Sequence, residues 1–310
     1  MAEETIQQTF NVPAGVPARL EVSNISGSVE VLPGEDGVIA VTAIKHPHTG
    51  DLERTEVVVS QVEDGKVKAE VKYREGWRFL GGSKPCQVSF TIRVPHQCSV
   101  QANGVSNSAS VRGLAGDFTV SSVSGQVTLN ELSGPVKLNT VSGDVDGGYL
   151  RGNLQFNTVS GDVRLKESAL AAVTGHTVSG DIALQTQLAD GPYTVNSVSG
   201  DVRLVVPVDT RCTAHVTGIS GRVHTAFPQT EYRRSNGTHV AEIQGGGVTV
   251  KLHSVSGDLW VGPVAGETPA PAEPAQPAQP ARPASPNRKE VLDRIERGEI
   301  TVEEGLKLLS

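Results

Sequence analysis

The hexapeptide TVSGDV at 140–145 returns as TVSGDV at 158–163 and as TVSGDI at 177–182. Four variants of the motif lie around these three copies: SVSGQV at 122–127, SVSGDV at 197–202, GISGRV at 218–223 and SVSGDL at 254–259. The first six copies follow one another after 18, 18, 19, 20 and 21 residues. Repetition at a nearly fixed period is typical of proteins that stack one small structural unit on the next. The motif therefore predicts the architecture before any site is considered.

A turn signal recurs every nine residues within this region. It is formed by Asn107 and by six glycines at the same spacing: Gly116, Gly125, Gly134, Gly143, Gly152 and Gly161. Glycine and, less readily, asparagine tolerate positive φ, so we expect positive-φ turns at these positions. Alternating segments such as Val163-Arg164-Leu165 follow the turns and predict strands. Two strand-turn units then make one coil, and coils stack about 4.8 Å apart.

Stacking places equivalent residues above one another and predicts two rows of inward-facing side chains. The first row is Val141, Val159, Val178, Val198, Ile219 and Val255. The second row is Val145, Val163, Ile182, Val202, Val223 and Leu259. The fold predicted for 104–261 is thus an all-β solenoid with room for about eight coils at that spacing.

The flanking segments extend this prediction. Residues 1–103 contain four alternating segments, which predict strands in a section continuous with the solenoid: 39–45, 55–62, 66–73 and 87–94. Asp64-Gly65 predicts a hairpin between two of them, and Asn236-Gly237 predicts another inside the long interval 224–252. We expect Trp260 to help cover the open end of the last coil.

The C-terminal part changes character. Residues 262–287 are rich in proline and alanine and predict an extended, flexible linker. Residues 288–310 predict a short helical hairpin, with a capping box from Thr301 to Glu304. Its apolar positions include Leu292, Ile295, Leu306 and Leu309. Two helices in 23 residues are too small to be stable alone, so we expect the hairpin to self-associate, to dock, or to bind a protein partner.

The net charge and the distribution of apolar residues exclude several classes of function. A net charge of −7 argues against a nucleic-acid partner, and no run of 18 apolar residues is present to span a bilayer. The N-terminal residues lack the pattern of a signal peptide, so we expect a cytoplasmic protein. Cys86, Cys98 and Cys212 are then expected as free thiols. The alternative is export by an unconventional route, with surface exposure and a Cys86–Cys98 bridge.

The VSGD-bearing coils and the strand-rich segment before them, over residues 5–261, resemble the bacterial putative-adhesin β-strand-repeat family DUF4097. The segment IERGEITVEEGLKLL at 295–309 is similar to the SHOCT-like helical hairpin that accompanies this family in some proteins. The resemblance implies a right-handed β-solenoid and, for some relatives, a link to cell-envelope stress. It implies no catalytic residue.

Two features are candidate sites. The aspartates of the motif, which would stack one per coil, could form a cation-binding stripe or could accept backbone N–H bonds in their turns: Asp144, Asp162, Asp181, Asp201 and Asp258. The loop at 73–85 concentrates Trp77, Arg78 and Phe79, which suit a protein or peripheral membrane contact. The same aromatic side chains could instead fold back over the end of the solenoid.

No catalytic constellation is visible in the sequence, and no cofactor fingerprint is present. The motif serine occurs in every coil, whereas a nucleophile is needed once, and the GxSxG elbow is missing. The sequence therefore favours a non-enzymatic scaffold for interactions. Two alternatives stay open, namely a surface adhesin and a polysaccharide-active β-helix enzyme.

Overall fold

The structure is a computed structural model that describes residues 3–73, 85–228, 230–235 and 237–264. The chain divides into two units, Met1–Pro269 and Ala270–Ser310, and the described residues belong to the first. Within them the fold is all-β, with 22 strands and one 3-10 turn at Pro47–Thr49. The predicted linker starts too early, because Gly262 and Pro263 belong to the last strand of the solenoid, Leu259–Pro263. Its residues from 265 onward and the predicted helical hairpin lie outside the described residues. No helix in the described ranges is long and apolar enough to cross a bilayer.

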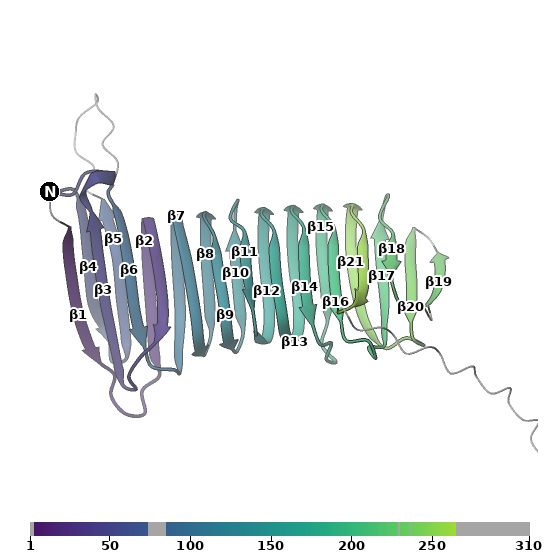
Figure 1. Cartoon of the computed structure of the whole chain (residues 1–310), viewed down its shortest axis with the longest axis horizontal. Coiled ribbons are helices and arrows are strands. Elements are labelled where there is room, and N and C mark those ends of the chain that lie inside the picture. Colours follow the sequence, from purple (N-terminus) through teal and green to yellow (C-terminus); the bar gives the residue numbers. More distant parts are fainter. Residues whose placement is uncertain (1–2, 74–84, 229, 236, 265–310) are drawn as a thin grey trace, which may run out of the picture. The chain divides into compact units, whose positions relative to one another are not determined.

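The strands stack in two layers along the direction from β1 to β19 (Figure 1). The first layer begins, in stacking order, with β4 (Thr55–Glu63), β5 (Lys66–Tyr73) and the first halves of the long strands β2 (Ala18–Pro33) and β7 (Cys98–Ala115). It continues with β8 (Phe118–Ser124), β10 (Val136–Thr140), β12 (Arg151–Ser160), the second half of β13 (Val163–Ser179) and β15 (Tyr193–Ser199). It ends with β21 (Val248–Ser256), β17 (Cys212–Gly218), β20 (Thr238–Ile243) and β19 (Thr230–Ser235). The second layer begins, in stacking order, with β1 (Glu4–Asn11), β3 (Val38–His46), β6 (Gln87–Val94) and the second halves of β2 and β7. It continues with β9 (Val127–Ser133), β11 (Val145–Gly148), the first half of β13, β14 (Ile182–Thr186), β16 (Val202–Val206), β22 (Leu259–Pro263) and β18 (Val223–Thr225).

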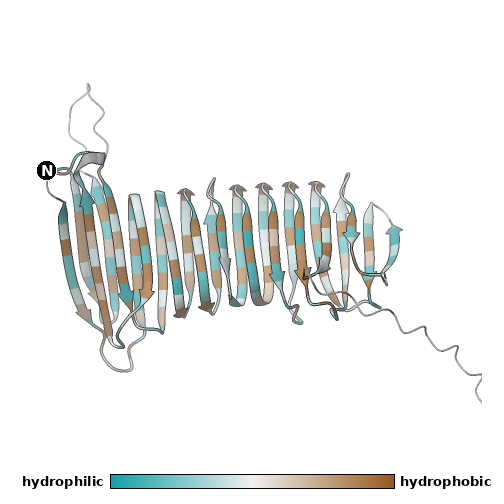
Figure 2. Ribbon diagram, viewed as in Figure 1, coloured by the Kyte–Doolittle hydropathy of each residue, from teal (hydrophilic) through white to brown (hydrophobic). Residues whose placement is uncertain are grey.

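The repeat pairs in parallel, coil on coil, and encloses an aliphatic core. Leu138 of β10 pairs with Val120 of β8 on one side and with Phe156 of β12 on the other. The second predicted row is confirmed, because its six residues are each at most 7% exposed: Val145, Val163, Ile182, Val202, Val223 and Leu259. Figure 2 shows the resulting alternation of hydrophobic and hydrophilic residues along the strands.

The first predicted row is wrong, because its residues face outward. Val141, Val159, Val178, Val198 and Val255 are 46–49% exposed, and Ile219 is 85% exposed. The cause is the phase of the alternation. Leu138 and Thr140 of β10 are both buried, so the next residue, Val141, must point away from the core. The inward position at this corner belongs to the residue before each valine.

The order of the coils is not the order of the sequence. β21 lies between β15 and β17, and β22 lies between β16 and β18. The last coil is therefore inserted between two coils that precede it in the chain. Trp260 does not cover an end, since its neighbours in β22's ladders are Arg203 and His224. The far end carries the predicted hairpin, formed by β19 and β20.

The N-terminal section joins the solenoid without a break. Its four predicted strands correspond to β3, β4, β5 and β6, and β2 pairs with β5 and β6 on one side and with β7 on the other. The hairpin between β4 and β5 contains Gly65 at φ 76°, as expected for an Asp-Gly turn. Cys86, Cys98 and Cys212 are free and buried, so no Cys86–Cys98 bridge forms.

Two different physical requirements explain why glycine occupies the turns. Gly116, Gly125, Gly134 and Gly152 have the predicted positive φ, between 122° and 152°, but Asn107, Gly143 and Gly161 are not among the residues in that region. A Cβ on Gly143 would collide with the carbonyl oxygen of Gly125 in the neighbouring coil, and the equivalent collision recurs at Gly161. These positions therefore require glycine because the stacked turns approach too closely for any side chain.

Candidate functional site

The outward apolar residues form a continuous valine ridge, with one residue from each of eight consecutive coils. In stacking order its members are Val105, Val123, Val141, Val159, Val178, Val198, Val255 and Ile219. Each lies just before the serine of the turn motif, so the repeat that builds the coil also builds the ridge. Isolated exposed valines are ordinary on protein surfaces, but a contiguous apolar strip marks an interaction surface.

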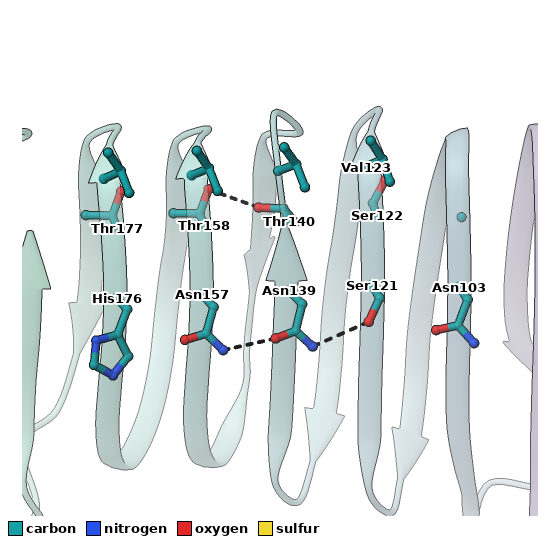
Figure 3. A pocket seen from close by; sticks show the side chains of 14 residues that line it. Asn103, Ser121, Ser122, Val123, Asn139, Thr140, Asn157, Thr158, His176 and Thr177 are labelled. Carbon is teal, nitrogen blue, oxygen red and sulfur yellow. Dashed lines mark hydrogen bonds between the residues drawn. The ribbon is translucent and has the colours of Figure 1, made fainter.

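A groove of about 390 Å³ runs along one side of this ridge, across β7, β8, β10, β12 and β13. One wall is the ridge, from Val123 to Val178. The opposite wall is a polar row, and the floor between them is a row of small buried residues (Figure 3). The polar row consists of Asn103, Ser121, Asn139, Asn157 and His176. The floor consists of Gly104, Ser122, Thr140, Thr158 and Thr177.

Side chains in the polar row bond to one another from coil to coil. Asn157 Nδ2 donates to Asn139 Oδ1 at 3.0 Å, and Asn139 Nδ2 donates to Ser121 Oγ at 3.4 Å. The ring nitrogen Nδ1 of His176 lies 3.3 Å from Asn196 Nδ2. Amides stacked at the coil spacing satisfy one another in this way, so the asparagine part of the wall is uncharged and already hydrogen-bonded.

The hydroxyl groups of the floor form fewer hydrogen bonds with one another than the side chains of the polar row do. Thr140 Oγ1 donates to Thr158 Oγ1 at 3.0 Å, and Thr158 Oγ1 donates to the carbonyl of Gly161 at 3.4 Å. Thr177 Oγ1 is buried and has no hydrogen-bond partner within the described ranges. The exposed valine side chains make the groove largely apolar, which suits an apolar partner more than a charged one.

The aspartates lie across the turn from the ridge and form a regular row. The backbone N–H of Asp162 donates to Asp144 Oδ1 at 3.0 Å, and that of Asp181 donates to Asp162 Oδ1 at 2.8 Å. The row continues through Asp201, Asp258 and Arg222. Each of these carboxylates thus accepts an N–H from the next coil. The described residues contain no cluster of three or more His, Cys, Asp and Glu side chains able to hold a metal ion.

A hydrogen-bonded chain of Glu3, His46 and Ser89 connects three strands or their ends near the start of the solenoid. His46 Nε2 lies 2.9 Å from Ser89 Oγ, and His46 Nδ1 lies 3.2 Å from Glu3 Oε1. The order of groups matches that of a serine nucleophile, its base and an orienting acid. Sequence reasoning missed this chain because its members are far apart in the sequence and no local motif connects them.

One further surface pair joins the inserted coil to its neighbour. The guanidinium carbon of Arg203 lies 4.3 Å from the centroid of the Trp260 ring. The predicted contact residues of the loop, Trp77, Arg78 and Phe79, lie outside the described residues. The same holds for the apolar positions predicted in the helical hairpin, namely Leu292, Ile295, Leu306 and Leu309.

A family model described as Toastrack DUF4097 matches residues 18–261. No curated protein matches the chain. Among solved structures, a protein of Parabacteroides distasonis described as a "putative lipid binding protein" is 12% identical, with a TM-score of 0.50 over 84% of this chain and 96% of that one. A "putative adhesin" of Bacteroides fragilis is 12% identical, with a TM-score of 0.47 over 84% and 97% of the two chains. At such identity the likeness to the first structure shows the fold alone.

Proposed function

We propose that this chain, which belongs to the Toastrack DUF4097 family, acts as a non-enzymatic interaction scaffold that binds another protein along its valine ridge. The observation that carries the proposal is the ridge itself. Eight consecutive coils each expose one apolar side chain at the same corner, by 46% or more. Side chains exposed to this degree contribute little to the core, so their recurrence in every coil points to a role outside folding.

Repetition also supports a role without catalysis. An active site brings different side chains together once, whereas here the same threonine, valine, serine and aspartate positions recur from coil to coil. The chain of Glu3, His46 and Ser89 is a weak candidate for a nucleophile, because the Glu3 side chain is 62% exposed. In serine hydrolases the orienting acid is buried, since water would otherwise compete for the histidine.

Other parts of the proposal rest on the sequence. We keep a cytoplasmic location, the right-handed winding, the helical hairpin as a second contact element, and an involvement in envelope stress as predictions. Surface adhesion is the alternative function, and it shares the requirement for an exposed binding surface. The acidic row beside the ridge disfavours nucleic acid and anionic lipid as partners because it would repel phosphate groups.

Photo-crosslinking of the full chain in cells tests this function. A benzophenone amino acid replaces Val159 on the ridge, and in a control it replaces Gln155, which is exposed on the same strand outside the groove. We expect covalent adducts with protein at position 159 and few at position 155. Equal adduct yields at the two positions would contradict a ridge-based scaffold.

A further inference from the structure

We infer that the protein bound along the valine ridge is a second copy of this chain, and that the ridge of each copy lies in the groove of the other. This inference rests on the proposed function and names its partner. The part of the ridge that borders the groove, from Val123 to Val178, would form the centre of this contact, and the rest of the ridge would extend it along the strip.

The spacing of the ridge favours a partner with the same repeat. Successive ridge valines lie in, or directly after, paired parallel strands, so they recur at the inter-strand spacing of about 4.8 Å. An extended peptide repeats its side chains on one face only about every 6.6 Å and would lose register after two or three contacts. A second solenoid with the same spacing keeps every contact in register along the whole strip.

The surface is also self-complementary. The ridge and the groove lie side by side on the first layer, with the ridge forming one wall of the groove. A two-fold axis parallel to the stacking direction, placed between ridge and groove, would bring the ridge of each copy opposite the groove of the other. This is the isologous arrangement that most homodimers use, in which one patch contacts itself.

Charge is compatible with this arrangement. The groove wall and floor are neutral amide, hydroxyl and methyl groups, apart from the ring of His176. The aspartate row lies across the turn, on the side of the ridge away from the groove. In the two-fold arrangement each acidic row would lie at the rim, beside the polar row of the other copy and not beside its acidic row. Charged rims around apolar centres are the usual anatomy of a specific interface.

The size of the strip predicts a weak dimer. Eight coils at about 4.8 Å give a strip of about 34 Å, and with its flanking rows it would cover roughly 500 Å² per copy. The total of roughly 1,000 Å² is near the lower limit for specific interfaces, so we expect a dissociation constant in the micromolar range.

Sedimentation velocity of the full chain, over about 1 to 200 µM, tests the inference. We compare the wild type with Val159→Asp/Val178→Asp and with a control of equal charge change, Gln101→Asp/Gln155→Asp, on exposed positions of the same layer outside the groove. We expect reversible dimers for the wild type and the control, and at least a tenfold weaker dimer for the ridge variant. Circular dichroism melts establish that each variant folds. If the aspartate variant does not fold, Val159→Thr/Val178→Thr replaces it, with the same expected direction.

A monomeric wild type over this range, or a ridge variant that dimerises as the wild type does, would overturn the inference. The photo-crosslinking experiment separates this failure from a failure of the scaffold function. Adducts at position 159 with proteins other than this chain would leave the scaffold function intact, whereas equal yields at positions 159 and 155 would remove both.

Discussion

The backbone N–H of Asp258 donates to Oδ1 of Asp201 at 2.9 Å, although 57 residues separate the two in the sequence. The next bond in the row runs from the N–H of Arg222 to Oδ1 of Asp258 at 2.8 Å. The coil of β21 and β22 is therefore held between a coil made much earlier and one made just before it. Folding of this end requires the chain to pass outward through β17 to β20 and then to return.

Removal of the inserted coil, formed by β21 and β22, should lower the local stability of the strands that stack beyond it. In a chain that ends at Gly247, β17 and β18 lose the parallel neighbours that β21 and β22 supply. We expect the amides of β17, β19 and β20 to lose most of their hydrogen-exchange protection, because local stability depends on the contacts that the unit retains. Amides of β8 to β12 should keep theirs.

A chain that ends at Val264 is the matched control, since it retains both inserted strands. Hydrogen–deuterium exchange with mass spectrometry compares the two truncated chains with the full chain. Equal protection of β17 in both truncated chains would mean that β17 can pair elsewhere and that the insertion is not needed for its order.

Two valines of one motif copy should differ sharply in their contribution to stability. Val163 is 1% exposed in the core, whereas Val159, four residues earlier, is 46% exposed on the ridge. We expect Val163→Ala to lower the free energy of unfolding by about 2 to 3 kcal/mol through lost burial and a cavity, and Val159→Ala to change it by less than about 0.5 kcal/mol. Urea unfolding of the full chain measures both. Similar losses at the two positions would show that the ridge is part of the core.

The sequence predicted the solenoid because each coil carries its own alternation and its own turn. The second inward row followed from counting, since Val145 and Val163 start strands that pair directly. The first row failed because the phase at the corner depends on where the strand ends, and Thr140, a polar residue, takes the inward position. Threonine and valine have nearly the same shape, so composition alone could not decide which of the two faces inward.

The insertion was beyond prediction for a related reason. The copies at 218–223 and 254–259 both carry the glycine and the strand that a neighbour requires, so either could stack on β15 and β16. Which copy stacks on β15 and β16 is decided by the tertiary structure, because the chain runs through β19 and β20 before it returns as β21. The groove, likewise, exists only once five coils are stacked, and no single repeat contains it.

The buried thiols should make stability decrease in alkaline solution. Burial raises the pKa of Cys98 to about 12 and that of Cys212 to about 11, whereas an unfolded cysteine has a pKa of about 8.5. Above that value the unfolded chain releases the two protons while the folded chain retains them. The stabilisation is therefore fully present below about pH 8.5 and declines as the pH rises toward 11 and 12.

Urea unfolding at a series of pH values between about 7.5 and 10.5 measures this decline. The variant Cys98→Ala/Cys212→Ala removes both titrating groups, and its stability should fall less steeply over the same range, although it starts lower because of the lost side-chain volume. A variant that follows the wild-type slope would show that other groups cause the alkaline loss. Alkylation by iodoacetamide should likewise be slow in the folded chain and fast in urea.

Ser89 should not behave as an activated nucleophile, despite its contact with His46. The His46 side chain is 32% exposed and that of Glu3 is 62% exposed, so water weakens both links of the chain and the histidine is not held as a base. We expect a fluorophosphonate probe to leave Ser89 unlabelled in the full chain at neutral pH. The variant His46→Ala should instead lower stability by about 1 kcal/mol, because it removes two hydrogen bonds that link the start of β1 to β6. Labelling of Ser89 that disappears in His46→Ala would contradict the non-enzymatic assignment and would make this end of the solenoid an active site.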